Sequence, residues 1–338
     1  MKKTLLISIL IATAITVNAQ KVALLHNGVT TIFSSVNPFT DAYTAAVSGD
    51  TIYLPGGSFT PPTLINKALT IFGAGHYVDS TMVTGKTYIN GGFTLQADAD
   101  KFYMEGLEIN GGVDFTSNES VNQVNIRRCK INTTINIPGN LTKPSTNFSL
   151  IGSVVQGNID LENAQTVLIS NSILQGQVVN SNGNLFNNSI WLNNYVSWGT
   201  GSTIGGNNNQ LNNNIFIRSS PDLIYGSGNI FIRNLCVHAT PGYGTLPTVN
   251  NTYPGVDQVN IFVNQTGYVF DYSHNYHLKT PATYLGTDGK EVGIYGGAFP
   301  YKEGAVPANT HFITKNIAAK TNINGQLQIQ IQVAAQKD

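Results

Sequence analysis

Short apolar runs broken by Asn, Ser and Gly recur along the middle of the chain. The clearest is Leu168-Ile169-Ser170-Asn171-Ser172-Ile173-Leu174, and residues 186–191 and 211–216 repeat its order of apolar and polar positions. The polar break returns every 17 to 25 residues, through Gly106, Arg128, Gly152, Asn171, Asn188, Asn213 and Asn234. A period of this size is typical of stacked supersecondary units. Because each unit contains short strands, we expect the chain to form a coil of β-structure.

A further short run follows a turn in each repeat. These runs are residues 93–95, 113–115, 135–137, 159–161 and 178–180. Most of them alternate, with apolar residues on either side of a polar one. In a strand this alternation places the outer two side chains in the core and the middle one in solvent. We therefore expect Asp114, Asn136 and Asp160 to share one exposed face.

The recurrent asparagines have a structural explanation. Asn tolerates the left-handed backbone conformation that a tight corner needs. Stacked Asn side chains also hydrogen-bond to each other and to the backbone one coil away. We interpret Asn171, Asn188, Asn213 and Asn234 as corner and ladder residues. The pattern of recurrent asparagines therefore indicates how the scaffold is built and does not mark a functional site.

Two segments outside the repeats carry a resemblance to a known family. The first contains Gly49-Asp50-Thr51-Ile52-Tyr53-Leu54 and Lys67-Ala68-Leu69-Thr70-Ile71-Phe72-Gly73-Ala74-Gly75. The second contains Tyr276-His277-Leu278-Lys279 and runs through Gly286-Thr287-Asp288-Gly289 to Gly296, with Thr280 where a Ser is common. They resemble the first coil and the closing segment of secreted bacterial right-handed parallel β-helix proteins of the pectin-lyase-like superfamily.

The resemblance covers about residues 40–300 and implies an all-β fold. We expect a right-handed, single-stranded parallel β-helix of about ten coils, with a cap at each end. Residues 20–300 form this domain with its caps, and residues 301–338 form a C-terminal extension. In the extension Leu327-Gln328-Ile329-Gln330-Ile331-Gln332-Val333 alternates without a break, which predicts a half-buried strand. This strand packs back on the solenoid or docks to the sheet edge of a partner.

The N-terminus reads as a secretory signal peptide. Lys2 and Lys3 form the basic start, an apolar stretch follows, and Val17-Asn18-Ala19 is a cleavage site of the small-residue type. We expect cleavage near Ala19 and a secreted protein that is extracellular, at the cell surface or periplasmic. The apolar stretch is too short for a retained anchor, and we expect no transmembrane anchor elsewhere.

The charge balance argues against one class of partner, and the cysteine spacing argues against a disulfide. The full chain has 18 basic and 18 acidic residues, and removal of residues 1–19 removes two lysines, which leaves a net charge of −2. Nucleic-acid binding needs a basic face, so we expect no nucleic-acid partner. Cys129 and Cys236 lie five repeats apart, or roughly 24 Å in stacked strands, which is too far for a disulfide. Both are expected to be small buried residues.

The resemblance also implies which types of catalytic residue an enzyme of this superfamily would carry. Lyases of this superfamily use clustered acids that hold calcium together with an Arg or Lys base, and the hydrolases use several Asp residues on neighbouring coils. The coils here hold few acids. Asp114, Asp160 and Glu162 form the alternative acidic site, with the two aspartates roughly 9 to 10 Å apart, near the upper limit for an inverting glycosidase. Calcium is a cofactor only under the lyase alternative, and otherwise we expect no cofactor or metal.

Aromatic residues suggest a binding site instead. Trp191, Tyr195 and Trp198 lie within eight residues beside a Gly/Asn-rich turn, and exposed aromatic rings stack on sugar rings. Alternatively, Trp191 fills the interior as its counterparts in other repeats do. The adjacent Arg127 and Arg128 point to opposite faces of a strand, and we expect an ordinary structural or surface role for them.

Three functions remain open at this point. The leading one is a non-catalytic protein that binds a polysaccharide or cell-surface glycan, or mediates surface adhesion. The second is a polysaccharide lyase or glycoside hydrolase with a non-standard site. The third is a structural component of a cell-surface assembly, with the C-terminal strand as the docking element.

Overall fold

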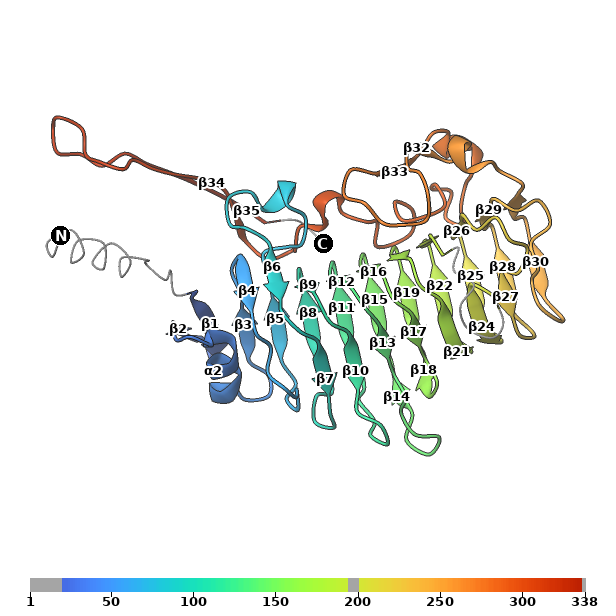
Figure 1. The fold of residues 1–338 in the computed structure, drawn as a ribbon, viewed down its shortest axis with the longest axis horizontal. Helices are drawn as coiled ribbons and strands as arrows, with labels where there is room; N and C mark the ends of the chain where they lie inside the picture. The colour runs from blue at the N-terminus through green and yellow to red at the C-terminus, as the bar shows by residue number, and fades with distance from the viewer. Residues whose placement is uncertain (1–19, 194–200, 336–338) are drawn as a thin grey trace, which may run out of the picture.

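The structure is a computed structural model that describes residues 20–193 and 201–335. The chain winds into a parallel β-solenoid of about 10 turns, which confirms the all-β parallel β-helix predicted from the repeats (Figure 1). Three long sheets, here called sheets A, B and C, run along its sides. None of the helices in the described residues is long and apolar enough to cross a membrane.

Sheet A is the longest, and its strands are parallel from β3 onward. In spatial order its strands are β2 (Val29–Phe33), β1 (Val22–His26), β3 (Thr51–Tyr53), β5 (Thr70–Phe72), β8 (Tyr103–Glu105), β11 (Asn125–Arg127), β15 (Ser149–Ile151), β19 (Leu168–Ser170), β22 (Leu185–Asn187), β25 (Gln210–Asn212), β28 (Ile230–Ile232) and β30 (Thr248–Asn250).

Sheet B follows sheet A around each coil after a sharp corner. Its parallel strands are β4 (Gly57–Phe59), β6 (Thr87–Ile89), β9 (Glu108–Ile109), β12 (Lys130–Ile131), β16 (Val154–Val155), β20 (Ile173–Leu174), β23 (Ile190–Trp191), β26 (Ile215–Phe216), β29 (Leu235–Cys236) and β31 (Tyr253–Pro254).

Sheet C is the third side. Its parallel strands are β7 (Phe93–Leu95), β10 (Val113–Phe115), β13 (Ile135–Asn136), β17 (Ile159–Asp160), β21 (Val178–Asn182), β24 (Ile204–Asn207) and β27 (Ile224–Tyr225). A minor pair, β14 (Ser145–Thr146) with β18 (Ala164–Gln165), extends two coils at one corner.

The interior is a stack of apolar side chains, one set from each coil. The inward residue of the short strands in the middle coils is buried, because the strand alternates and neighbouring coils are in register. At the last coil β30 is exposed at all three positions. Trp191 stacks on Phe216 of the next coil with ring centroids 5.5 Å apart, and Phe186 meets Trp191 edge-on at 5.6 Å. Cys129 and Cys236 are free and buried, as their spacing predicted.

At the corner between sheets A and B, two neighbouring residues divide the two roles that we had predicted for a single Asn, namely turning the chain and forming the ladder. Asn171, Asn188 and Asn213 have φ values of 51°, 49° and 57°, which confirms them as left-handed corner residues. Asn213 also donates from Nδ2 to Asn188 Oδ1 one coil away, at 3.5 Å, but the main ladder is formed by the residue after each corner. Asn214 N–H, for example, donates to Asn234 Oδ1 one coil away at 2.9 Å.

The assignment of Asn234 to the corner column was therefore wrong. Strand register places Arg233, with φ 52°, at the corner of that coil. Asn234 belongs to the buried ladder one position later. The ladder members are Ser153, Ser172, Ser189, Asn214 and Asn234.

The N-terminal end of the solenoid is covered by β1, β2 and one short helix. Strand β1 pairs antiparallel with both β2 and β3. Helix α2 (Pro38–Ala45) begins with Pro38, whose fixed φ suits a first helical turn. It buries Phe39, which contacts the ring of Phe93 edge-on.

Residues 256–306, here called the strap, lie along the flank of the solenoid, over the outer face of sheet B (the orange segment of Figure 1). The sequence had suggested an end-piece over the last coil. Sheet B explains the difference, because its strands bury both side chains of consecutive apolar pairs such as Ile173-Leu174. The inner residue joins the solenoid core, and the outer one needs the strap as its cover.

The strap itself has little regular structure. It contains one antiparallel strand pair and three single 3-10 turns. These elements are β32 (Phe262–Asn264), β33 (Asn275–Leu278), η2 (Gln258–Asn260), η3 (Pro281–Thr283) and η4 (Glu303–Ala305), and a further turn, η1 (Asp79–Thr81), receives the end of the strap.

The C-terminal extension forms a two-stranded hairpin that projects from the solenoid (Figure 1). Strand β34 (His311–Ile317) pairs antiparallel with β35 (Ile329–Ala334). The predicted strand is confirmed, but its predicted half-burial is wrong. Its residues from Ile329 to Val333 are all exposed, because the only strand beside β35 in the described structure is β34. Residues 301–306 belong to the strap, Pro307 is also buried, and the backbone N–H of Ala308 donates to Glu105, so the projecting part begins after Ala308.

Candidate functional site

The outer face of sheet C carries the row of polar side chains predicted from alternation. Asp114 pairs in register with Asn136, and Asn136 pairs with Asp160. The apolar neighbours of these residues, such as Val113 and Ile159, are buried, so the polar side chains point outward. The shared face of the three residues is confirmed.

Amide side chains hold the two carboxylates in place. Asn136 donates from Nδ2 to Asp114 Oδ1 at 2.5 Å and to Thr134 Oγ1 at 3.2 Å. Asn180 donates from Nδ2 to Asp160 Oδ1 at 2.9 Å. The backbone N–H of Glu162 donates to the same oxygen at 3.2 Å. Because each carboxylate is tied to a neighbouring amide, the row has a fixed hydrogen-bonding surface.

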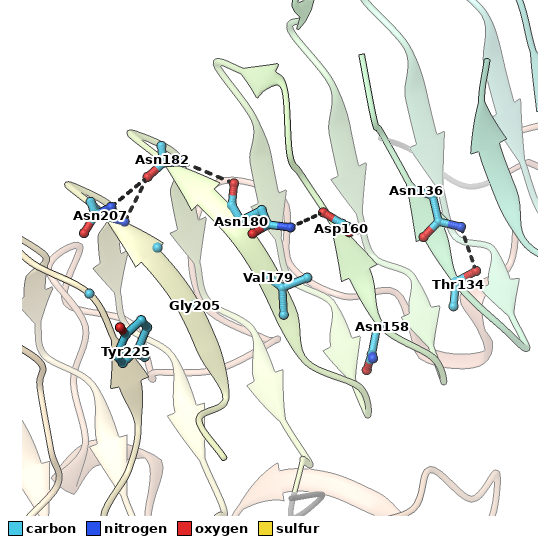
Figure 2. Close-up of a pocket in the computed structure, with 12 residues that line it drawn as sticks. Thr134, Asn136, Asn158, Asp160, Val179, Asn180, Asn182, Gly205, Asn207 and Tyr225 are labelled. Atoms are coloured by element: carbon cyan, nitrogen blue, oxygen red, sulfur yellow. Dashed lines mark hydrogen bonds between the residues drawn. The ribbon is translucent and has the colours of Figure 1, made fainter. Parts of the chain in front are cut away.

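The row continues into a groove of about 760 Å³. Thr134, Asn136, Asn158 and Asp160 line one end of it. Figure 2 shows these side chains on neighbouring strands, with the Asn180–Asp160 bond in the middle of the row. A groove of this volume is within the range of natural small-ligand sites.

The other end of the groove is lined by Asn182, Asn207 and Tyr225 (Figure 2). Asn207 donates from Nδ2 to Asn182 Oδ1 at 3.1 Å, so the amide ladder extends along this edge. Tyr225 is 64% exposed and lies opposite Gly205 in the strand register. Gly205 has no side chain and therefore leaves one face of the tyrosine ring uncovered.

The aromatic site predicted from sequence is different. Trp191 is fully buried in the solenoid core between Phe186 and Phe216, so its predicted role in binding is wrong and the interior alternative is correct. Tyr195 and Trp198 lie outside the described residues. Tyr225 was missed. The sequence could have indicated it, because Ile224-Tyr225 has the same order of an inward apolar residue and an outward residue as Val113-Asp114.

The alternative acidic site is only partly assembled. Asp160 lines the groove, whereas Asp114 lies one strand beyond its Asn136 end. Glu162 is exposed on the turn after β17. Asp114 and Asp160 each accept an amide hydrogen bond from the following coil. Asn136 lies between the two aspartates and only Asp160 lines the groove, so the two carboxylates do not converge on one position there.

The residues also do not fit a calcium site of the lyase type. Within the described residues, no group of three or more His, Cys, Asp or Glu side chains lies close enough to hold a metal ion. Calcium needs six to eight oxygen ligands, with several carboxylates among them. Asp160 is the one carboxylate among the described residues that line the groove, which does not meet that requirement.

Comparison with known proteins gave no relatives: no protein-family model, curated protein or solved structure matches this chain. The geometry of the groove is therefore the main guide to function.

Proposed function

We propose that this protein is an exported β-helix protein of the pectin-lyase-like type that binds a weakly charged polysaccharide in the sheet C groove without cleaving it. The observation that carries the proposal is a groove lined mainly by amide side chains, broken by Val179 and Gly205, that ends at an exposed tyrosine, with Asp160 as the one carboxylate among the described residues that line it. The export step rests on the signal-like residues 1–19, with their basic start and apolar stretch.

The chemistry of the groove suits sugar hydroxyls. An amide side chain offers two donors and one acceptor, and a hydroxyl group offers both functions as well. Asn136, Asn158, Asn180 and Asn207 supply four such groups along one direction. The apolar C–H face of a sugar ring packs on an aromatic ring, and Tyr225 presents its ring at the end of the row.

The length of the groove favours a polymer over a single sugar. Its lining residues come from five adjacent strands, β13, β17, β21, β24 and β27. Four steps of about 4.8 Å give a length of roughly 19 Å. Past the Asn136 end the outward row continues through Asp114 and Thr94, so a chain longer than the groove can extend in that direction.

Affinity electrophoresis through gels that contain neutral, uronic or sulfated polysaccharides tests the proposal. We expect one class to retard the protein, and Tyr225→Ala to weaken that retention about tenfold, as expected for loss of an aromatic contact. Tyr88→Ala, on the outer face of sheet B, is the matched control and should bind normally. Normal retention of Tyr225→Ala, or retention by no polymer, would contradict the proposal.

The same samples test the catalytic alternative. A hydrolase releases reducing ends, and a lyase releases unsaturated ends that absorb ultraviolet light. We expect neither product with the parent protein. If either accumulates and Asp160→Asn or Asp114→Asn abolishes it, the protein is an enzyme and the non-catalytic proposal fails.

The projecting hairpin supports a second role, attachment to a partner through β-strand addition. Its outer strand edges have no partner strand in the described residues, and Phe312, Ile317, Ile329 and Ile331 are exposed on it. An exposed apolar edge of this kind is a template for another strand. Deletion of residues 309–338 should abolish capture on cells of the source organism and leave glycan retention intact. Equal capture of both proteins would exclude the role.

A further inference from the structure

A second pocket, of about 300 Å³, lies on the opposite side of the A–B corner from the core, between the solenoid and the strap. The solenoid side is formed by Arg127, Arg128 and Gly152. The strap contributes residues 298–300 together with Lys290 and Lys302. This pocket shares no lining residue with the sheet C groove.

The pocket lies beside a coil in which the residue at the corner between sheets A and B is a glycine and not an asparagine. Asn171, in the next coil, donates from Nδ2 to the carbonyls of Ile294 and Gly296, both at 2.8 Å. Asn213 accepts from the backbone N–H of Thr287 at 2.9 Å. These bonds hold the strap against the corner. Gly152 occupies the equivalent position one coil earlier and has no group to reach the strap.

Positive charge is concentrated around this opening. Four of its lining residues are cationic, and no acidic residue is among those described as lining it. The mature chain has a net charge of −2, so this local excess does not reflect the average composition. Converging Arg and Lys side chains are typical of sites for carboxylate, sulfate or phosphate groups.

Contacts behind the pocket orient its two arginines. Arg128 donates from Nη1 to Glu105 Oε1 at 2.5 Å, and Glu105 is only 1% exposed. Glu105 also accepts from the backbone N–H of Ala308 at 2.8 Å and from the Tyr103 hydroxyl at 2.6 Å, so its carboxylate is fixed in place. The guanidinium of Arg127 lies 5.7 Å from the ring centre of Phe299. A ligand in the pocket would therefore meet cations that are already positioned.

We propose that this pocket binds one oxyanion group, a carboxylate, sulfate or phosphate, through Arg127, Lys290 and Lys302. Its volume suits a single anionic group or a single acidic sugar, and the strap wall of residues 298–300 closes one side. The site is independent of the glycan proposed for sheet C, because the two surfaces have no residue in common.

The test is a titration of the protein with sodium sulfate, sodium phosphate and sodium glucuronate at low and constant ionic strength, followed by calorimetry. We expect saturable one-site binding of at least one anion, with sodium chloride as the blank. The anion with the tightest binding identifies the source of the group. Lys302→Gln and Arg127→Gln should each weaken it about tenfold, as expected for loss of a charge-assisted hydrogen bond.

Gly152→Asn tests whether anion binding requires the space inside the pocket or only the positive charge around it. A Cβ at Gly152 would meet only Arg128 Cγ, at 3.6 Å, and Asn suits its φ of 61°. This variant keeps all four cations but fills the opening, so we expect it to lose anion binding. Lys143→Gln removes an exposed charge that does not line the pocket and should bind normally.

Three results would overturn the proposal: no saturable binding of any anion, unchanged affinity in Gly152→Asn, or equal weakening by Lys143→Gln. Thermal melting of each variant checks that the fold is intact. Tyr225→Ala should retain the anion site in full, so failure of the glycan proposal and failure of this one are distinguishable.

Discussion

Gly205 lies directly opposite Tyr225 on neighbouring parallel strands, and it leaves the space in front of the tyrosine ring open. A Cβ built on Gly205 meets nothing nearer than the Cα of Val179, at 3.9 Å. The backbone there is ordinary extended strand, which any residue can adopt. The groove therefore depends on a missing side chain that the scaffold itself does not require.

Gly205→Val should abolish glycan retention and leave the fold unchanged. The valine side chain would occupy the space beside Tyr225, and a β-branched residue suits a strand. We expect at least a tenfold loss in affinity electrophoresis with a melting temperature within about 2 °C of the parent. Thr94→Val is the matched control, since Thr94 lies in the same outward row beyond the groove. Retention by Gly205→Val equal to that of the parent would place the binding surface elsewhere.

Asn171 is the residue we expect to matter most for attachment of the strap. It is fully buried, adopts φ 51° and donates two hydrogen bonds to the strap backbone. Asn171→Gly keeps the corner conformation but loses both bonds, so we expect a loss of about 1–3 kcal/mol in the free energy of unfolding.

Urea denaturation measures that loss, and limited proteolysis should show earlier cleavage within residues 286–297. Asn208→Gly is the control, because Asn208 also has a left-handed φ, of 55°, but is exposed to solvent. If both variants behave alike, the strap is held by apolar packing alone and the Asn171 bonds are incidental.

His76 makes stability depend on pH. It is fully buried beside Tyr77 and Tyr272, and burial lowers its pKa from 6.5 to about 3, with Glu108 opposing and Lys130 and Lys86 adding to the shift. The folded state therefore keeps this histidine neutral, while the unfolded chain takes up a proton below about pH 6.5. Stability due to His76 is full above that pH and falls as the pH decreases, by up to ~1.4 kcal/mol per unit.

His76→Phe should flatten this slope, because phenylalanine has a similar shape and no proton to bind. The measurement is the urea midpoint of parent and variant at several values between about pH 7 and pH 5, above the usual range of carboxylate titration. His311→Phe, in the projecting hairpin, should keep the slope of the parent. A parallel decline of His76→Phe and parent would show that other groups cause the pH dependence.

Much of the scaffold could be predicted from local pattern. Alternation determines which side chain of Val113-Asp114-Phe115 faces the core, and stacking in register then places Asp114, Asn136 and Asp160 in a row. Corner residues were predictable because Asn tolerates a left-handed φ. The misplacement of Asn234 arose because Arg233 turns the corner of that coil, whereas the neighbouring Asn belongs to the ladder, and only strand register shows this.

The strap and the groove were harder to predict for physical reasons. Ile173-Leu174 is a consecutive apolar pair, which in a strand means burial on both faces, yet the pair does not reveal which distant segment covers the outer one. The groove depends on Gly205 and Tyr225, which lie two and three coils from Asp160. The groove forms where a side chain is missing beside neighbouring strands, and the periodicity of any one strand does not reveal such a space.

Cys129 and Cys236 should be unreactive in the folded protein. Both are buried and free, and burial raises the pKa of each thiol to about 12. The thiolate is the reactive species, so almost none is present at mildly alkaline pH. We expect no modification by a disulfide reagent in native buffer and modification of both thiols in guanidinium chloride. Ser117→Cys, at an exposed turn, is the positive control and should react at once. Rapid native modification of the parent would show that the coils open just before β12 or at β29, and comparison of Cys129→Ala with Cys236→Ala would show which of the two opens.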